Sequence, residues 1–203
     1  MSKVKVKKHD TFIDMTAMSD VTVLLLTFFM LTATFIPKEP IMVITPQSVS
    51  EFKVPEYDVL TILVDPNGKV FMNIDRPDSK RATLERMGGL YGLTFTPKQI
   101  NAFSYPTTFI GVPMREMRSF LDKPMDEQDI MINEYGIPAD SINNQLAQWI
   151  RAAKDVNSDL QIAIKADQST AYPHVKNVIS TLQDLKENRY RLITNLRGMP
   201  EGF

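Results

Sequence analysis

The chain has 203 residues, a formal net charge of −1 and a hydrophobic content of 43%. This length indicates one domain, or one domain with appendages, and the balanced charge without a basic stripe gives no indication of nucleic-acid binding. The sequence has no cysteine, which excludes disulfides and thiolate metal sites, and its two histidines, His9 and His174, are far apart. We therefore expect neither a metal nor a cofactor.

An apolar segment near the N-terminus is the first predicted element. Residues 17–36 carry a single charge, that of Asp20. As a helix rising about 1.5 Å per residue, this segment spans about 30 Å, enough to cross the hydrocarbon core of a bilayer. Pro37 ends the helical pattern. We predict a transmembrane helix over 17–36 after a tail of residues 1–16. A cleaved signal peptide is the alternative, although the segment is long, contains a carboxylate and lacks a small-x-small cleavage site.

The lysines around this segment predict its orientation. Lys3, Lys5, Lys7 and Lys8 precede it, whereas Lys38 alone follows it closely. The positive-inside rule then places the N-terminus in the cytoplasm and the rest of the chain across the membrane. The predicted localisation is a single-pass protein of the inner membrane, with its C-terminal domain in the periplasm.

Asp20 is the residue of greatest interest in the predicted span. An ionised Asp in a lipid-facing helix costs about 2.5–3.5 kcal/mol, so such residues usually face protein or water and serve a function. A carboxyl group that gains and loses a proton would suit a proton-coupled device. Asp20, Thr27 and Thr34 recur every seven residues, and this polar stripe favours contact with other helices. The alternative is that Asp20 caps the helix N-terminus, although Met15 and Met18 extend the apolar pattern upstream.

The sequence after the span predicts a tethered domain. Residues 37–53 contain three prolines and indicate an extended linker. Residues 57–64 predict a strand, 65–68 a turn and 69–73 the second strand of a hairpin. We assign residues 54–203 to a small α+β domain.

Four helices are predicted in the middle of the chain. They cover residues 78–87, 97–103, 113–121 and 138–156. The glycine pair Gly88 and Gly89 is expected to end the first of them. Trp149 lies on the apolar face of the last helix, which favours a core position over a ligand-binding one.

A strand–helix–strand unit is predicted at the end of the domain. It comprises a strand over 160–164, a helix over 173–185 and a strand over 190–195. Lys165 and Asp167 follow the first strand, where a solvated loop with a helix-capping Asp is favoured over a catalytic pair. The sequence contains no nucleophile elbow, phosphate loop or dinucleotide fingerprint, so we expect no catalytic residues and no enzyme.

Residues 12–30, with the sequence FIDMTAMSDVTVLLLTFFM, resemble the N-terminal signature of the ExbD/TolR biopolymer-transport family. The resemblance places Asp20 at the position of the family's protonatable aspartate, although Ala17 stands where the family often has proline. Residues 162–167, followed by Tyr172 and a helix, are similar to the family's strand-Ala-Asp-helix unit.

The linker resembles the family in a weaker way. Ile41, Val43 and Pro46 follow the family's pattern of alternating aliphatic residues before a proline, which implies a partner-binding role. Thr45 replaces the usual leucine and leaves that role open. Residues 75–158 are longer than the corresponding part of the family and are interpreted as an inserted subdomain of unassigned role.

The resemblance implies an ExbD-like subunit of a proton-driven motor that energises outer-membrane transport. Its implied partners are a polytopic ExbB/TolQ-like membrane protein, a TonB-like protein and a second copy of the same chain. A TolR-like subunit for envelope integrity, with contact to peptidoglycan, is the first alternative. A membrane-tethered binding or scaffold protein without energy coupling is the second.

Overall fold

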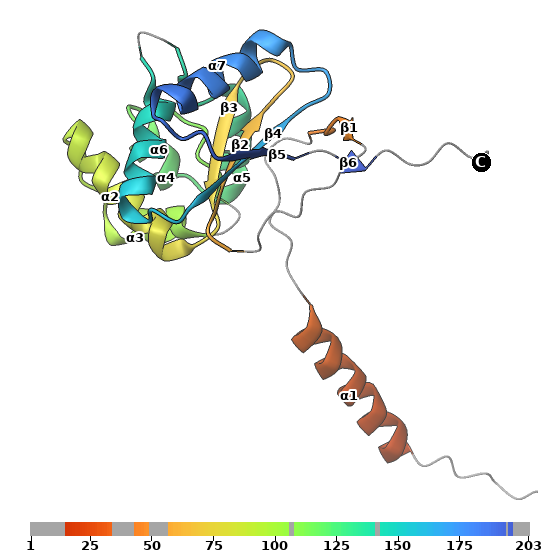
Figure 1. The fold of residues 1–203 in the computed structure, drawn as a ribbon. Helices are drawn as coiled ribbons and strands as arrows, with labels where there is room; N and C mark the ends of the chain where they lie inside the picture. Colours follow the sequence, from red (N-terminus) through yellow and green to blue (C-terminus); the bar gives the residue numbers. More distant parts are fainter. Residues whose placement is uncertain are drawn as a thin grey trace, which may run out of the picture. The chain divides into compact units, whose positions relative to one another are not determined.

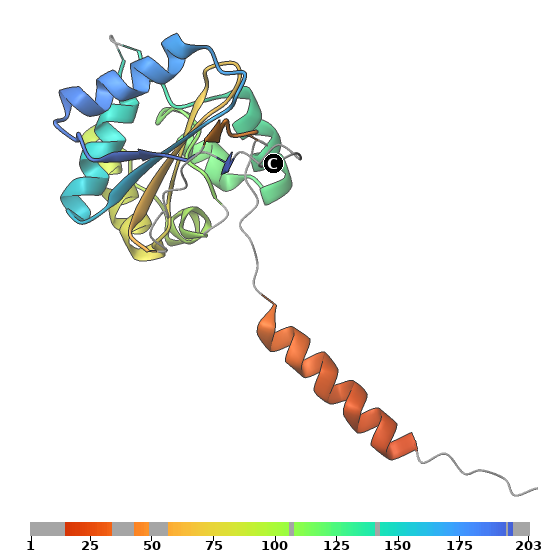
Figure 2. The same ribbon diagram turned by 45° about the vertical axis from the view of Figure 1, so that its right-hand side comes forward.

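The structure of the chain is a computed structural model that describes residues 15–33, 43–48, 57–105, 108–140, 143–193 and 195–196. The chain divides into two compact units, Met1–Ile36 and Pro37–Phe203, and each is described by itself (Figures 1 and 2). Together they contain both helix and sheet, with a single apolar helix in the first unit.

The first unit contains helix α1, Met15–Thr32. Its 18 residues correspond to about 27 Å of helix, and none of them is buried. The helix begins two residues before the predicted start at residue 17. The predicted end at residue 36 lies outside the described residues, as does Thr34.

A four-stranded sheet organises the second unit. Its order is β3-β2-β4-β5, with β3 antiparallel to β2 and the other neighbours parallel. The strands are β2 (Val59–Val64), β3 (Val70–Ile74), β4 (Gln161–Ala166) and β5 (Tyr190–Leu192). All residues of β2 except Thr61 are buried, so both faces of this central strand are covered. That explains why its sequence is almost continuously apolar.

Strands β2 and β4 are neighbours although a long segment separates them in the chain. They pair in register from Val59 with Gln161 to Val64 with Ala166. Five helices lie between β3 and β4 in the chain (Figure 1). They are α2 (Pro77–Tyr91), α3 (Pro97–Ser104), α4 (Met117–Asp122), α5 (Met125–Glu134) and α6 (Gln145–Val156). The middle segment thus leaves the sheet at one strand and returns at another.

The sequence predicted that helix α2 ends at its glycine pair, and this prediction is wrong. It continues through Gly88 and Gly89 to Tyr91, and Gly92 ends it in the left-handed conformation with φ 65°. Gly88 is needed for packing, because a Cβ at this position would lie 2.6 Å from the carbonyl oxygen of Leu93. The glycine that ends the helix is therefore the one that must adopt positive φ.

The other helices of the middle segment also differ from the prediction. Helix α6 begins at Gln145 rather than at residue 138, because Asn144 caps it by accepting a hydrogen bond from the backbone N–H of Ala147 at 2.9 Å. Helix α4 begins at Met117 rather than at 113. Helix α5 was not predicted, and its sequence lacks a helical apolar period, with Gln128 and Ile132 its buried residues.

The core prediction for Trp149 is confirmed. Its side chain is fully buried and stacks on Phe103, with ring centroids 6.0 Å apart and an interplanar angle of 18°. The apolar faces of α2, α3 and α6 meet at this point, next to the sheet.

The C-terminal part contains helix α7 (Tyr172–Asp184) between β4 and β5. The predicted last strand over 190–195 is divided, because β5 ends at Leu192 and a second short strand, β6 (Asn195–Leu196), follows. Strand β6 pairs in parallel with β1 (Gln47–Ser48), which lies in the predicted linker. The chain therefore continues past the strand–helix–strand unit and returns to the linker.

Candidate functional site

Asp20 lies inside helix α1 and does not cap it. The helix begins at Met15, which places Asp20 in the second turn, and the first turn contains no acidic residue. Thr27 lies seven residues further along the same helix, and its hydroxyl donates to the backbone carbonyl of Leu24 at 2.9 Å. Asp20 and Thr27, two of the three residues of the predicted polar stripe, therefore lie on α1. The third, Thr34, lies outside the described residues.

The residues that follow Asp20 on α1 are mostly apolar and exposed. Val21 and Leu24 are 64% and 60% exposed, and the helix buries no residue against the rest of the chain. Within the described part of the chain, no side chain forms an ion pair or hydrogen bond with the Asp20 carboxylate. A carboxylate in this setting can accept hydrogen bonds or take up a proton, and in a bilayer water or another helix must supply its partner.

Part of the linker is bound to its own domain. The backbone N–H of Ile44 donates to Asp167 Oδ2 at 2.7 Å, and the N–H of Gln168 donates to the carbonyl of Ile44 at 2.8 Å. Thr45 is buried, and Val43 and Pro46 are partly buried.

Among the candidate partner-binding residues, Ile41 lies outside the described residues. Val43 and Pro46 border the contact with Asp167. The described part of the linker thus has a binding partner within the chain.

Asp167 organises the loop that receives the linker. Its Oδ1 accepts hydrogen bonds from the backbone N–H and the hydroxyl of Ser169, at 2.8 and 2.6 Å. The hydrogen bonds from Ser169, and then the one from Ile44, lower the pKa of this carboxyl. The predicted helix-capping role is wrong, because Ala171 is the N-cap of α7 and no side chain caps that helix. Sequence reasoning missed the contact with Ile44 because the partners are 123 residues apart.

Two further features bear on the class of protein. Among the described residues, no three side chains of His, Asp or Glu gather in a way that could hold a metal ion. Helix α1 has a mean hydropathy of 1.6, and it alone among the described helices is long and apolar enough to cross a membrane.

Comparison with known proteins gives one match. The family model described as "Biopolymer transport protein ExbD/TolR" matches residues 6–90, which include α1 with Asp20, the strands β1 to β3 and almost all of α2. No curated protein and no solved structure matches the chain. The residues after 90 lie beyond the family match. The N-terminal region of this chain, residues 6–90, is therefore similar to the ExbD/TolR family of biopolymer transport proteins.

Proposed function

We propose that this chain is the ExbD-like subunit of an inner-membrane proton-driven motor, with Asp20 as the residue that takes up and releases the proton. The observation that carries the proposal is the position of Asp20 inside an apolar helix that offers it no partner. The family match over residues 6–90 supports it, because that match includes the helix and the carboxylate.

The proposed mechanism starts from the cost of this carboxylate in lipid. Two copies of α1 sit inside a ring formed by a polytopic ExbB/TolQ-like partner, which supplies the polar contacts that α1 lacks. Protonation neutralises Asp20 and removes its attraction to those contacts, so that the helix can shift against the ring. One charge crossing the membrane field provides about 2.3 kcal/mol per 100 mV. Thr27 lies on the face that contacts the neighbouring helices, and the sequence pattern assigns Thr34 to the same stripe.

The domain after residue 54 is the part that transmits this motion. With the N-terminus in the cytoplasm, residues 37–53 link the membrane helix to a periplasmic domain that acts with a TonB-like protein on outer-membrane transport. In this proposal the role is coupling rather than catalysis.

Replacement of Asp20 by Asn tests the proposal. Asn is close in size to Asp but does not titrate, so the complex should still assemble while energised uptake falls to the level of a strain without the chain. Asp14→Asn is the matched control, because it removes a carboxylate just before the apolar segment. Co-purification with the polytopic partner and uptake across the outer membrane are measured for both variants. If Asp20→Asn supports uptake at the wild-type rate, the motor proposal is wrong and a scaffold role remains.

The TolR-like alternative is distinguished by the phenotype of the same variant. An ExbD-like role predicts lost uptake with an intact envelope, whereas a TolR-like role predicts leakage of periplasmic proteins with uptake retained. The mass of the protein extracted from membranes tests the uncleaved anchor, because cleavage of a signal peptide would remove α1.

A further inference from the structure

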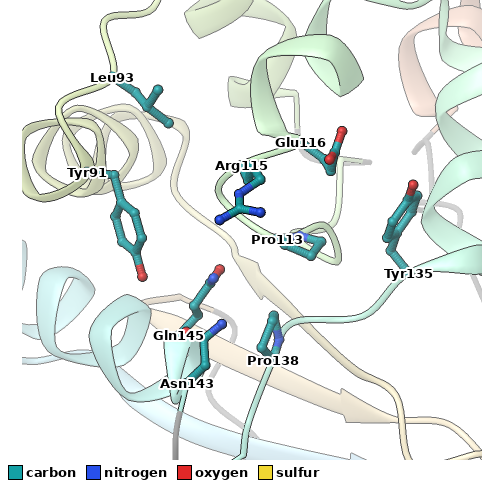
Figure 3. Close-up of a pocket in the computed structure, with 9 residues that line it drawn as sticks. All are labelled: Tyr91, Leu93, Pro113, Arg115, Glu116, Tyr135, Pro138, Asn143 and Gln145. Atoms are coloured by element: carbon teal, nitrogen blue, oxygen red, sulfur yellow. The ribbon is translucent and has the colours of Figure 1, made fainter.

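A cavity of about 680 Å³ lies in the part of the second unit that the family match does not reach (Figure 3). Its walls come from the end of α2, the loop before α4, the end of α5 and the start of α6. This volume falls within the range of ligand sites in proteins, about 300–1,000 Å³. It is lined by Tyr91, Leu93, Pro113, Arg115, Glu116, Tyr135, Pro138, Asn143 and Gln145.

Polar groups converge inside this cavity. Figure 3 shows the Arg115 guanidinium pointing toward Tyr91 and toward the side-chain amides of Asn143 and Gln145, whereas the carboxylate of Glu116 points away from them. Gln145 is held in place, because its Oε1 accepts a hydrogen bond from the backbone N–H of Met114 at 3.0 Å. Apart from Glu116, whose carboxylate points away, the residues that line this cavity with Arg115 are neutral.

A second cavity, of about 460 Å³, shares Tyr91 with the first. Arg86 and Arg151 line it, together with Leu90, Gln148 and Asp155. Arg86 forms an ion pair with Asp155 at 2.7 Å, which leaves Arg151 as the second cation without a carboxylate partner among the described residues. Burial raises the pKa of the Tyr91 hydroxyl, and the nearby Gln148 side chain partly offsets that rise. Each of the two cavities that share Tyr91 is thus lined by an arginine that has no carboxylate partner in the described part of the chain.

This arrangement favours a particular class of ligand. Arginine pairs with carboxylates through parallel hydrogen bonds, and amide side chains such as Asn143 and Gln145 carry both a donor and an acceptor, as a peptide group does. Tyrosine and proline offer apolar surface for side chains. A polyanion such as nucleic acid or polyphosphate would require a denser row of cations than Arg115 and Arg151 provide.

We propose that the two cavities form one binding site for an extended acidic peptide segment, which crosses Tyr91 and pairs its carboxylates with Arg115 and Arg151. The site is built almost entirely from residues after the family match, so it assigns a role to the middle segment that is independent of the proton-coupling proposal. In this arrangement the middle segment provides the chain with a recognition surface of its own.

Fluorescence anisotropy with the full chain in nanodiscs tests the site. The probe is a fluorescein-labelled peptide, Gly-Glu-Ala-Glu-Ala-Glu-Gly, and its counterpart with glutamine in place of glutamate is the uncharged control. Arg115→Gln and Arg151→Gln are each expected to weaken binding about fivefold, and the double variant by more than tenfold. Arg118→Gln is the matched variant, because Arg118 is also exposed on the same stretch of chain but lines neither cavity. It should change the affinity by less than about twofold.

Thermal unfolding of the variants shows whether the fold is intact, and exposed arginines should leave it unchanged. The proposal is wrong if the wild type does not bind the acidic probe, or binds the uncharged peptide as tightly. It is also wrong if Arg118→Gln weakens binding as much as the two cavity variants, or if polyphosphate binds where the peptide does not.

Discussion

Asp20 on α1 and Lys80 on α2 are both ionisable side chains in apolar surroundings, but the chain satisfies them in different ways. Lys80 is fully buried, and its ammonium donates to Asn73 Oδ1 at 2.9 Å, to the carbonyl of Tyr105 at 2.9 Å and to the carbonyl of Thr108. Asp20 has no such partner among the described residues. The domain therefore satisfies its buried charge internally, whereas the described residues supply no such partner to Asp20.

The same contrast holds for the apolar residues of the two regions. The core of the domain is built from residues at or near 0% exposure, such as Leu60 and Ile62 on β2. Leu26 and Phe28 on α1 are 65% and 60% exposed. A largely apolar helix that buries nothing in its own chain is adapted to lipid or to other helices.

The largest effect on stability is expected from Lys80→Met. This change removes the ammonium that donates to the carbonyls of Tyr105 and Thr108 and to the amide oxygen of Asn73, although the Tyr105 carbonyl keeps its hydrogen bond from the N–H of Thr108. The loss of these three hydrogen bonds should lower the free energy of unfolding by about 3–5 kcal/mol. Denaturant unfolding followed by the fluorescence of Trp149, the one tryptophan of the chain, measures it. Lys98→Met, at an exposed position of α3, should stay within about 0.5 kcal/mol of the wild type. Equal or higher stability of Lys80→Met would show that burial of the charge outweighs its hydrogen bonds.

The pH dependence of stability sharpens this comparison. Burial lowers the pKa of Lys80 from 10.5 to about 7, so between these values the unfolded chain binds more protons than the folded one. The free energy of unfolding should therefore rise with pH above 7, by at most about 1.4 kcal/mol per pH unit. Below pH 7 this lysine is protonated in both states, so it adds no pH dependence to the free energy of unfolding. The Lys80→Met variant should lack that slope. Parallel slopes for the two proteins between pH 7 and 10 would contradict the assignment.

A smaller effect is expected from the glycine pair of α2. Gly88→Ala introduces a Cβ 2.6 Å from the carbonyl oxygen of Leu93, and the required shift should cost about 1–3 kcal/mol. Gly89→Ala meets no atom within 4 Å and should stabilise the helix by about 0.5–1 kcal/mol. Thermal unfolding of the two variants side by side measures opposite shifts in Tm. Shifts of the same sign would mean that the close approach of Gly88 to the carbonyl oxygen of Leu93 does not decide the effect of an added Cβ.

The most local effect is expected from Asp167→Asn. The lowered pKa of Asp167 means that its hydrogen bonds stabilise the folded state above its ordinary pKa of 3.8, and this contribution is lost as pH falls through the lowered value. The variant should therefore exchange the amide hydrogen of Ile44 faster than the wild type at neutral pH. Hydrogen exchange followed by mass spectrometry measures it. Ser158→Ala, at an exposed position away from the linker contact, should leave that exchange rate unchanged.

Sequence patterns predicted the elements whose side chains repeat at a local period. The apolar segment around α1, the hairpin of β2 and β3 and the helix α7 follow from such patterns, and so does the core position of Trp149. The position of Asp20 within its helix also follows, because a charge interrupts an otherwise apolar run.

Only the tertiary structure decided the features that join distant parts of the chain. The hydrogen bond of Ile44 to Asp167, the pairing of β1 with β6 and the burial of Lys80 depend on residues that lie far apart in sequence. Helix α2 passes through Gly88 and Gly89 because packing against Leu93 outweighs the low helix propensity of glycine. Local propensity acts over a few residues, whereas burial and hydrogen bonding are satisfied across the whole fold. The sequence by itself therefore indicated the membrane helix and its carboxylate, and the folded domain determined how the linker, the buried lysine and the paired cavities are arranged.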